Sequence, residues 1–157
     1  MQHVFWLRPD VIGGRPGPDM EPWDAQEMAR GGIGAVLSIN HGELVDAEAL
    51  ASAGIEHLCV PLSTSAPPEP GDLEICVDAL PRAFEFAEQS IASGQTVLAH
   101  CRAGKDRTGM FLCYDLCRSE GLSAEQAIEE VRRVRSIALT AEGYVPFTLE
   151  VLAALGV

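Results

Sequence analysis

Short apolar segments of strand length alternate with helical patterns along the chain, and this alternation constrains the fold more than any other feature. Strand-like runs lie at 3–7, 11–12, 34–39, 56–62 and 96–100. Helical patterns lie at 22–30, 43–54, 73–91, 108–119, 123–135 and about 142–155. Alternating strands and helices favour parallel pairing through helical crossovers. The sequence therefore predicts an α/β fold with a central, mainly parallel sheet flanked by helices.

Several local signals refine these boundaries. The first two runs predict an opening hairpin or edge strands that end before the glycine-rich segment 13–17. Residues 63–72, STSAPPEPGD, contain too much proline for regular structure. Pro81 lies inside the longest helical pattern and is expected to kink or split it. Ser123 and Gln126 form a capping box at the start of the next-to-last helix.

Length and charge limit the possible partners. With 157 residues and 47% apolar composition, the chain is predicted to form a single domain over 1–157 with a substantial core. Twenty-three acidic and eleven basic residues give a formal charge of −12. No general basic surface is available for phosphate backbones, which argues against nucleic acid as a partner. Lys105 is the only lysine among the eleven basic residues.

No apolar stretch is long enough for a membrane span, and the N-terminal residues do not resemble a secretory signal. The five cysteines are an odd number without paired spacing, which predicts a reducing, cytoplasmic compartment. Cys113 and Cys117 share a helix face, but no second Cys or His pair completes a metal site. We therefore expect this pair to pack in the core and to hold no metal. No cofactor is predicted. The oligomeric state is left open.

Reactive residues concentrate in the segment His100–Gly109, HCRAGKDRTG. A buried strand leads directly into Cys101, a short loop with Gly104 follows, and a helix begins at once. The N–H groups of such a loop and of the helix N-terminus converge on a concavity that suits an anion. A thiol beside this positive helix end and Arg107 ionises readily, so Cys101 is expected to be an activated nucleophile.

Two residues after the loop support this chemistry. Arg107 has a planar guanidinium that can bind two phosphate oxygens together, which lysine cannot do. Thr108 is expected to donate its hydroxyl proton to the sulfur of Cys101 and stabilise the thiolate. The predicted phosphate-binding residues are Arg102, Ala103, Gly104, Lys105, Asp106 and Arg107.

The Cys-x5-Arg-Thr pattern after His100 resembles the signature of the cysteine-dependent protein tyrosine phosphatase superfamily. Segments 13–17, 32–40 and 54–62 are similar to parts of its compact dual-specificity branch, whose length also fits. The resemblance implies that Cys101 attacks phosphorus, Arg107 holds the phosphoryl oxygens, and water hydrolyses a cysteinyl-phosphate without a metal. It also implies that His100 orients the cysteine backbone. Alternatively, His100 is simply a buried histidine bonded to a nearby carbonyl.

The general acid departs from the family pattern. The family expects an aspartate shortly after the position of Pro61, but Ser63 or Thr64 stands there. Asp106 is the favoured replacement, because the related myotubularin phosphatases carry an aspartate at the matching position. Glu69 and Asp72 are alternatives, although Asp72 is also well placed to cap the following helix. A third alternative is that no protein acid is needed for an aryl leaving group.

Substrate class is open between proteins and smaller molecules. Phosphotyrosine, phosphoserine or phosphothreonine in proteins is the first choice. Lys105 leaves phosphoinositides or inositol phosphates as an alternative, since family members acting on them often carry a basic loop residue; equally, Lys105 can point outward. A third reading is a catalytically weak phosphate-binding pseudophosphatase.

Other polar residues are predicted to be ordinary surface groups. Arg132, Arg133 and Arg135 follow Glu129 and Glu130 by one helical turn, which predicts a solvated face of ion pairs. Alternatively, Arg135 or Ser136 approaches the rim of the pocket if the following loop folds over it. His57, like the other histidines outside the loop, is predicted to be a surface or strand residue, and Trp23 a packing residue.

Overall fold

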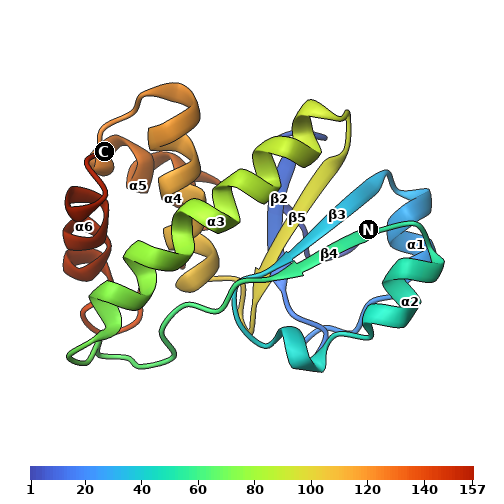
Figure 1. Ribbon diagram of the computed structural model, residues 1–157, viewed down its shortest axis with the longest axis horizontal. Helices are drawn as coiled ribbons and strands as arrows, with labels where there is room; N and C mark the ends of the chain where they lie inside the picture. The colour runs from blue at the N-terminus through green and yellow to red at the C-terminus, as the bar shows by residue number, and fades with distance from the viewer.

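The computed structural model describes residues 1–157 (Figure 1). Five strands, six α-helices and one short 3-10 helix follow one another along the chain. In order they are β1 Phe5–Arg8, β2 Ile12–Pro16, α1 Ala25–Arg30, β3 Ile33–Ser38, η1 Gly42–Leu44, α2 Ala47–Ser52, β4 Glu56–Cys59, α3 Asp72–Ala92, β5 Thr96–Cys101, α4 Arg107–Glu120, α5 Ala124–Val134 and α6 Tyr144–Ala154.

The strands form one sheet in the order β1-β2-β5-β3-β4. Only β1 is antiparallel to its neighbour, so the predicted mainly parallel sheet is confirmed. Strand β5 lies at the centre, with Pro16 of β2 opposite Cys101 and Ser38 of β3 opposite His100. The carboxyl ends of β2, β3 and β5 therefore meet at one edge, beside Cys101.

Strand β2 runs further than expected. It includes Gly13 and Gly14, which were predicted to follow the edge strands rather than to form one. A side chain at either position would overlap Phe5 or Trp6 of β1. The two glycines therefore let aromatic residues of β1 lie flat on β2, and the backbone pairing with β5 continues to Pro16.

The helices cover the sheet in two layers of unequal size (Figure 1). Alternate residues of β5 point to opposite faces, as the strand period requires. Val97 and Ala99 join a core cluster of 30 buried residues under α3, α4, α5 and α6. Leu98 joins a smaller cluster of seven buried residues under α1 and α2. Both faces of the central strand are thus buried, which explains the apolar run Val97–Ala99.

Two helix predictions need correction, and one of the two alternatives for Pro81 is excluded. The first helix begins at Ala25 with Asp24 as its N-cap, because the Asp24 carboxylate accepts from Glu27 N. The 43–54 pattern divides into η1 and α2, since Asp46 caps a new helix. Helix α3 is continuous through Pro81 and is not split. Its buried face, which includes Leu80 and Phe84, packs on both sides of that proline.

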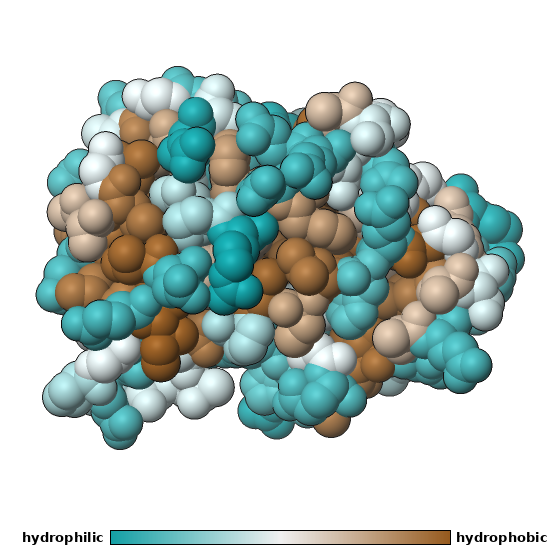
Figure 2. All heavy atoms as spheres, viewed as in Figure 1, coloured by the Kyte–Doolittle hydropathy of each residue, from teal (hydrophilic) through white to brown (hydrophobic).

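The capping box of Ser123 and Gln126 is confirmed at the start of α5. Strand β4 ends at Cys59, so the 56–62 run is a strand only in its first half. No helix combines the length and the apolar character needed to cross a bilayer. Figure 2 shows polar residues across the face that carries α3, with apolar residues gathered mostly where α6 lies.

Candidate active site

The loop between β5 and α4 lies at the edge of the sheet, where β5 ends at Cys101 and α4 begins at Arg107. Gly104 has φ of 63°, and a side chain on it would overlap the Arg15 backbone. Gly17 packs equally closely on the Cys101 carbonyl. Glycine is therefore required at both positions for the loop to rest against the end of β2.

In this loop the backbone carbonyl groups are hydrogen-bonded within the protein, whereas the backbone N–H groups are not. None of the five N–H groups of Arg102–Asp106 donates a hydrogen bond within the protein, whereas all five carbonyl oxygens accept one. The donors to these carbonyls are the amides of Gly17, Leu139 and Met110 and the guanidinium of Arg135. Five free donors next to a helix N-terminus form an anion-binding cradle.

Arg135 holds the loop from outside. Its Nε lies 3.1 Å from Gly104 O and its Nη2 2.7 Å from Ala103 O, and its guanidinium stacks 5.2 Å from the Phe5 ring centre. Burial lowers the pKa of Arg135, and negative charge at the nearby Cys101 works against that shift. Two charge-assisted bonds to adjacent carbonyls turn the corresponding peptide planes, so that the N–H groups that follow point the other way.

Arg135 therefore follows the alternative that the sequence left open, because it reaches the loop beside Cys101. The prediction of a solvated arginine face is wrong for Arg132. Arg132 donates to Ala138 O at 2.9 Å and to Leu139 O at 3.3 Å. Only Arg133 makes the expected ion pair, with Glu130 at 2.9 Å. The sequence missed this because the carbonyl partners lie on loops whose positions depend on the tertiary fold.

Cys101 lies at the floor of the cradle and is 3% exposed. Arg107 Nε donates to Ser63 O at 2.8 Å, and its guanidinium lies 5.1 Å from the Tyr144 ring centre. Asn40 Nδ2 approaches the same carbonyl at 3.3 Å. Arg107 therefore joins the loop between β5 and α4 to the proline-rich segment and to α6.

Tyr144 was not found by the sequence analysis. It is 1% exposed, and burial raises the pKa of its hydroxyl, while the Arg107 guanidinium opposes that shift. The tyrosine is therefore neutral and forms an aromatic wall for Arg107. Only its place at the first turn of the last helix would have marked it.

The expected contact of Thr108 with the nucleophile is not formed. Thr108 is completely buried, and its Oγ1 has no hydrogen-bond partner, Cys101 included. As the second residue of α4, its side chain is directed by the helix backbone rather than by the loop. The prediction relied on adjacency in sequence, which does not determine that direction.

The candidate acids differ in the contacts that already hold their carboxyl groups. Both Asp106 oxygens face Lys105 Nζ, at 3.1 and 2.9 Å, and one also accepts from Ala141 N at 3.2 Å. Asp72 is the first residue of α3 and accepts from Glu69 N at 2.7 Å, while Gly71 takes the N-cap position. Glu69 is exposed on the loop before α3. Of the residues at the family's aspartate position, Ser63 is buried and Thr64 is exposed.

Two basic residues of the loop are already paired. Lys105 Nζ also contacts Thr140 Oγ1 at 3.0 Å, so it bridges Asp106 and the loop after α5. Arg102 faces solvent with 63% of its side chain exposed and lies 3.4 Å from an Asp19 oxygen. Neither of these side chains is committed to the floor of the cradle.

His100, which precedes Cys101 at the end of β5, is completely buried. Its Nδ1 lies 3.0 Å from Cys101 O, and its Nε2 lies 2.6 Å from Ser38 Oγ. His57 is a strand residue of β4, as predicted, and its Nε2 lies 2.8 Å from Ser38 Oγ, a contact that the sequence did not indicate. Burial lowers the pKa of His100 to about 4, and it is therefore neutral at physiological pH.

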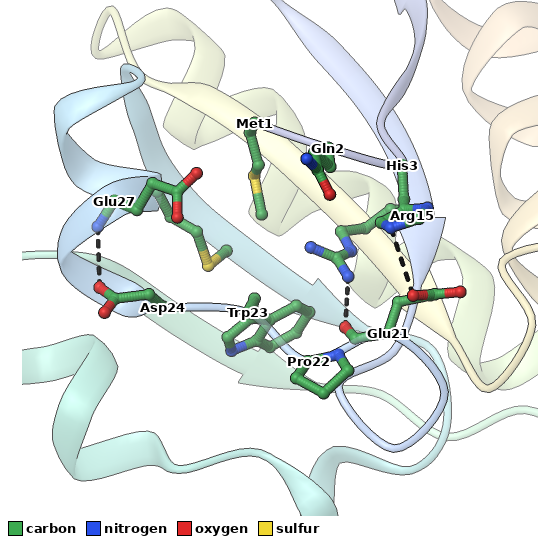
Figure 3. A pocket seen from close by; sticks show the side chains of 10 residues that line it. Met1, Gln2, His3, Arg15, Glu21, Pro22, Trp23, Asp24 and Glu27 are labelled. Carbon is green, nitrogen blue, oxygen red and sulfur yellow. Dashed lines mark hydrogen bonds and ion pairs between the residues drawn. The ribbon is translucent and has the colours of Figure 1, made fainter.

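The edge of Trp23 meets the His100 ring, with centres 5.1 Å apart. Figure 3 shows Trp23 beside Arg15 in a neighbouring hollow of about 400 Å³, which does not include Cys101. The Arg15 guanidinium stacks 5.3 Å from the Trp23 ring centre. Trp23 thus separates this hollow from the histidine, and its predicted packing role is confirmed.

Known proteins resemble this chain in sequence and in fold. The family model described as "Dual specificity phosphatase, catalytic domain" matches residues 24–150. The chain belongs to this family. A crystal structure of Tk-PTP in its active form has a TM-score of 0.77, with 24% identity over 98% of this chain and 96% of that one. The dual-specificity phosphatase fold is therefore confirmed over nearly the whole chain.

Relatives within the phosphatases fall into two groups. Dual specificity protein phosphatase 12 of Mus musculus is 29% identical, covering 98% of this chain and 42% of its own. Phosphatidylglycerophosphate phosphatase PTPMT2 of Arabidopsis thaliana is 28% identical, covering 71% of this chain and 47% of its own. The chain thus spans less than half the length of either relative.

A structure of PTPMT1 in complex with PI(5)P has a TM-score of 0.74 and 18% identity, with 99% of this chain and 97% of that one covered. At this identity the likeness concerns the fold. The same architecture therefore serves relatives whose names refer to proteins and relatives whose names refer to lipids.

Proposed function

We propose that this protein is a cysteine-dependent phosphatase that hydrolyses phosphate monoesters through a cysteinyl-phosphate. The observation that carries the proposal is the cradle: five backbone N–H groups of Arg102–Asp106 without protein partners, arranged next to Cys101 at the start of α4. Such donors match the equatorial oxygens of a phosphoryl group. Their hydrogen bonds become stronger as negative charge develops on these oxygens in the transition state.

The reaction has two steps. In the first, the Cys101 thiolate attacks phosphorus in line, an S–P bond forms, and the P–O bond to the substrate breaks as its oxygen takes up a proton. In the second, water attacks the same phosphorus, the S–P bond breaks, and inorganic phosphate leaves with the thiolate restored. Arg107 binds two phosphoryl oxygens once its guanidinium turns from Ser63 O to the cradle.

Glu69 is proposed as the acid that protonates the leaving oxygen. The sequence favoured Asp106, but both oxygens of that residue already accept hydrogen bonds or face Lys105. The Asp72 carboxylate accepts a hydrogen bond from the backbone N–H of Glu69. Glu69 is an exposed carboxyl group on a segment without regular structure, so it can move toward the cradle.

The pH dependence of kcat tests the acid, with an alkyl phosphate as substrate because an alkyl leaving group needs protonation. Glu69→Gln is expected to lower kcat by about 10²-fold and to remove the fall in activity at high pH. Asp106→Asn is expected to keep that fall. The opposite pair of results would return the role to Asp106, and no loss in either variant would mean that neither residue supplies the proton.

For the substrate, phosphorylated protein side chains are the first choice. Lys105, the residue that favoured an inositol phosphate, is held by Asp106 and Thr140, which supports this choice. The net charge of −12 also disfavours anionic lipid surfaces. The decisive comparison is kcat/KM for a phosphotyrosine peptide against phosphatidylglycerophosphate and PI(5)P in mixed micelles. A higher value for either lipid would overturn the choice, and phosphate binding without turnover of any of them would indicate a pseudophosphatase.

A further inference from the structure

A hydrogen-bonded chain of three side chains leads from the edge of the sheet to the peptide bond after the nucleophile. We propose that Ser38 and His57 are positioning residues that lock His100 in a single tautomer and thereby aim the first N–H of the phosphate cradle. This inference rests on the proposed function, since it concerns the same nucleophile and loop.

The directions of the bonds follow from the chemistry of the partners. Cys101 O is only an acceptor, so His100 Nδ1, 3.0 Å away, must carry the proton. In a neutral imidazole, Nε2 is then an acceptor, and Ser38 Oγ at 2.6 Å must donate to it. Ser38 has one hydroxyl proton, so its contact with His57 Nε2 at 2.8 Å requires His57 to donate. Each proton in the chain therefore has one position.

The contact with His57 sets the direction in which the Ser38 hydroxyl proton points. A serine hydroxyl rotates freely and can point its proton away from His100. By occupying a lone pair of Ser38 Oγ, the His57 N–H leaves the serine proton directed at His100. His57 is half-buried on β4, whereas Ser38 and His100 are completely buried on β3 and β5. The chain thus crosses three neighbouring strands of the sheet.

The surroundings keep His100 neutral, which the tautomer lock requires. Burial is the main cause of its low pKa, and the positive charge that His57, Arg15 or His41 can carry works in the same direction. Trp23 covers the ring edge-on, at 5.1 Å between centres. In a protonated His100 both ring nitrogens would be donors, so Ser38 Oγ would have to accept a hydrogen bond from Nε2 instead of donating one.

The locked proton acts on the catalytic loop through one peptide plane. Cys101 C=O and Arg102 N–H belong to the same peptide unit, so they point in opposite directions. Holding the carbonyl on His100 therefore fixes the first N–H of the cradle. In the other tautomer, the bare Nδ1 would face Cys101 O, and the repulsion of two lone pairs would turn that peptide away.

Two matched pairs of variants test the inference. Ser38→Ala removes the hydroxyl and Ser38→Thr retains it. His57→Met removes the donor, while His57→Gln offers an amide N–H on a side chain of similar length. Tautomers are assigned by ¹⁵N–¹H NMR of the histidine rings, and the rate of Cys101 alkylation by iodoacetamide is followed against pH by peptide mass spectrometry.

We expect wild-type protein, Ser38→Thr and His57→Gln to show only the Nδ1–H form of His100. Ser38→Ala and His57→Met should show a mixture, an alkylation midpoint moved by about half a pH unit or more, and kcat lowered about 5- to 30-fold with little change in KM. A pure Nδ1–H form with an unchanged alkylation profile in these two variants would overturn the inference. Because NMR and alkylation need no turnover, the lock is tested even if wild-type protein hydrolyses no phosphate ester, a result that would refute only the proposed function.

Discussion

The most quantitative prediction concerns the contribution of Asp115 on α4 to the stability of the fold. Its side chain is 3% exposed, and burial raises its pKa from 3.8 to about 6, although Arg8 partly opposes the shift. Arg8 Nη2 lies 3.1 Å from Asp115 Oδ2, yet that oxygen has no aligned hydrogen-bond donor. The pair is close but poorly aligned, so the carboxylate is not fully compensated for its loss of water.

The raised pKa fixes the sign of the pH dependence. The folded state holds the Asp115 proton more tightly than the unfolded state, so its contribution is most favourable below about pH 4 and is lost as pH rises through 6. At 1.36 kcal/mol per pKa unit, the loss between pH 4.5 and 8 is about 2 kcal/mol. Asp115→Asn has the same shape and no charge to desolvate.

The test is urea unfolding of both proteins at pH 4.5 and 8, read as free energies of unfolding. From pH 4.5 to pH 8, the free energy of unfolding of the Asn variant relative to that of wild type should rise by about 2 kcal/mol, with equal m-values. The difference between the proteins is used because His100, with its pKa lowered to about 4, has the opposite effect on wild type and loses stability as pH falls. The same gap at both pH values would refute the reasoning.

Two further predictions concern the catalytic loop. Gly104→Ala should cost about 3 kcal/mol or more and most of the activity, since the residue has φ of 63° and its added carbon would overlap the Arg15 backbone. Gly121→Ala is the control for backbone strain alone, because φ is 69° but nothing lies within 4 Å, and it should cost only about 1 kcal/mol by thermal unfolding. Arg135→Lys keeps the charge but loses one of two bonds to the loop carbonyls, and kcat should fall about 10-fold with an unchanged fold by circular dichroism; unchanged kcat would show that the loop holds its shape without Arg135.

The sheet and the loop are predictable because their signals are local. A buried strand such as β5 contains a continuous apolar run, Val97–Ala99, and a strand, a cysteine, a glycine and a helix start occur together within one short segment. The strand β2 was read too short because Gly13 and Gly14 signal turns in isolation. They lie in a strand here because β2 pairs with β1 and β5, and the aromatic side chains of β1 occupy the space that larger residues would need.

The partners of the loop were not predictable because they come from distant parts of the chain. Arg135 finds carbonyls about thirty residues earlier, and Ser38 and His57 reach His100 across the sheet. No spacing in the sequence shows which of several histidines or arginines lies at the correct register. Strand order determines that register, and strand order depends on the whole fold.

The central claim is that Cys101 is the nucleophile of a phosphatase. Its most direct test is phosphate release from para-nitrophenyl phosphate by wild-type protein and Cys101→Ser, with and without vanadate. We predict turnover by wild type, inhibition by vanadate, and no turnover by Cys101→Ser even though the variant still binds phosphate. Turnover that persists in Cys101→Ser, or no turnover by wild type, would contradict the account.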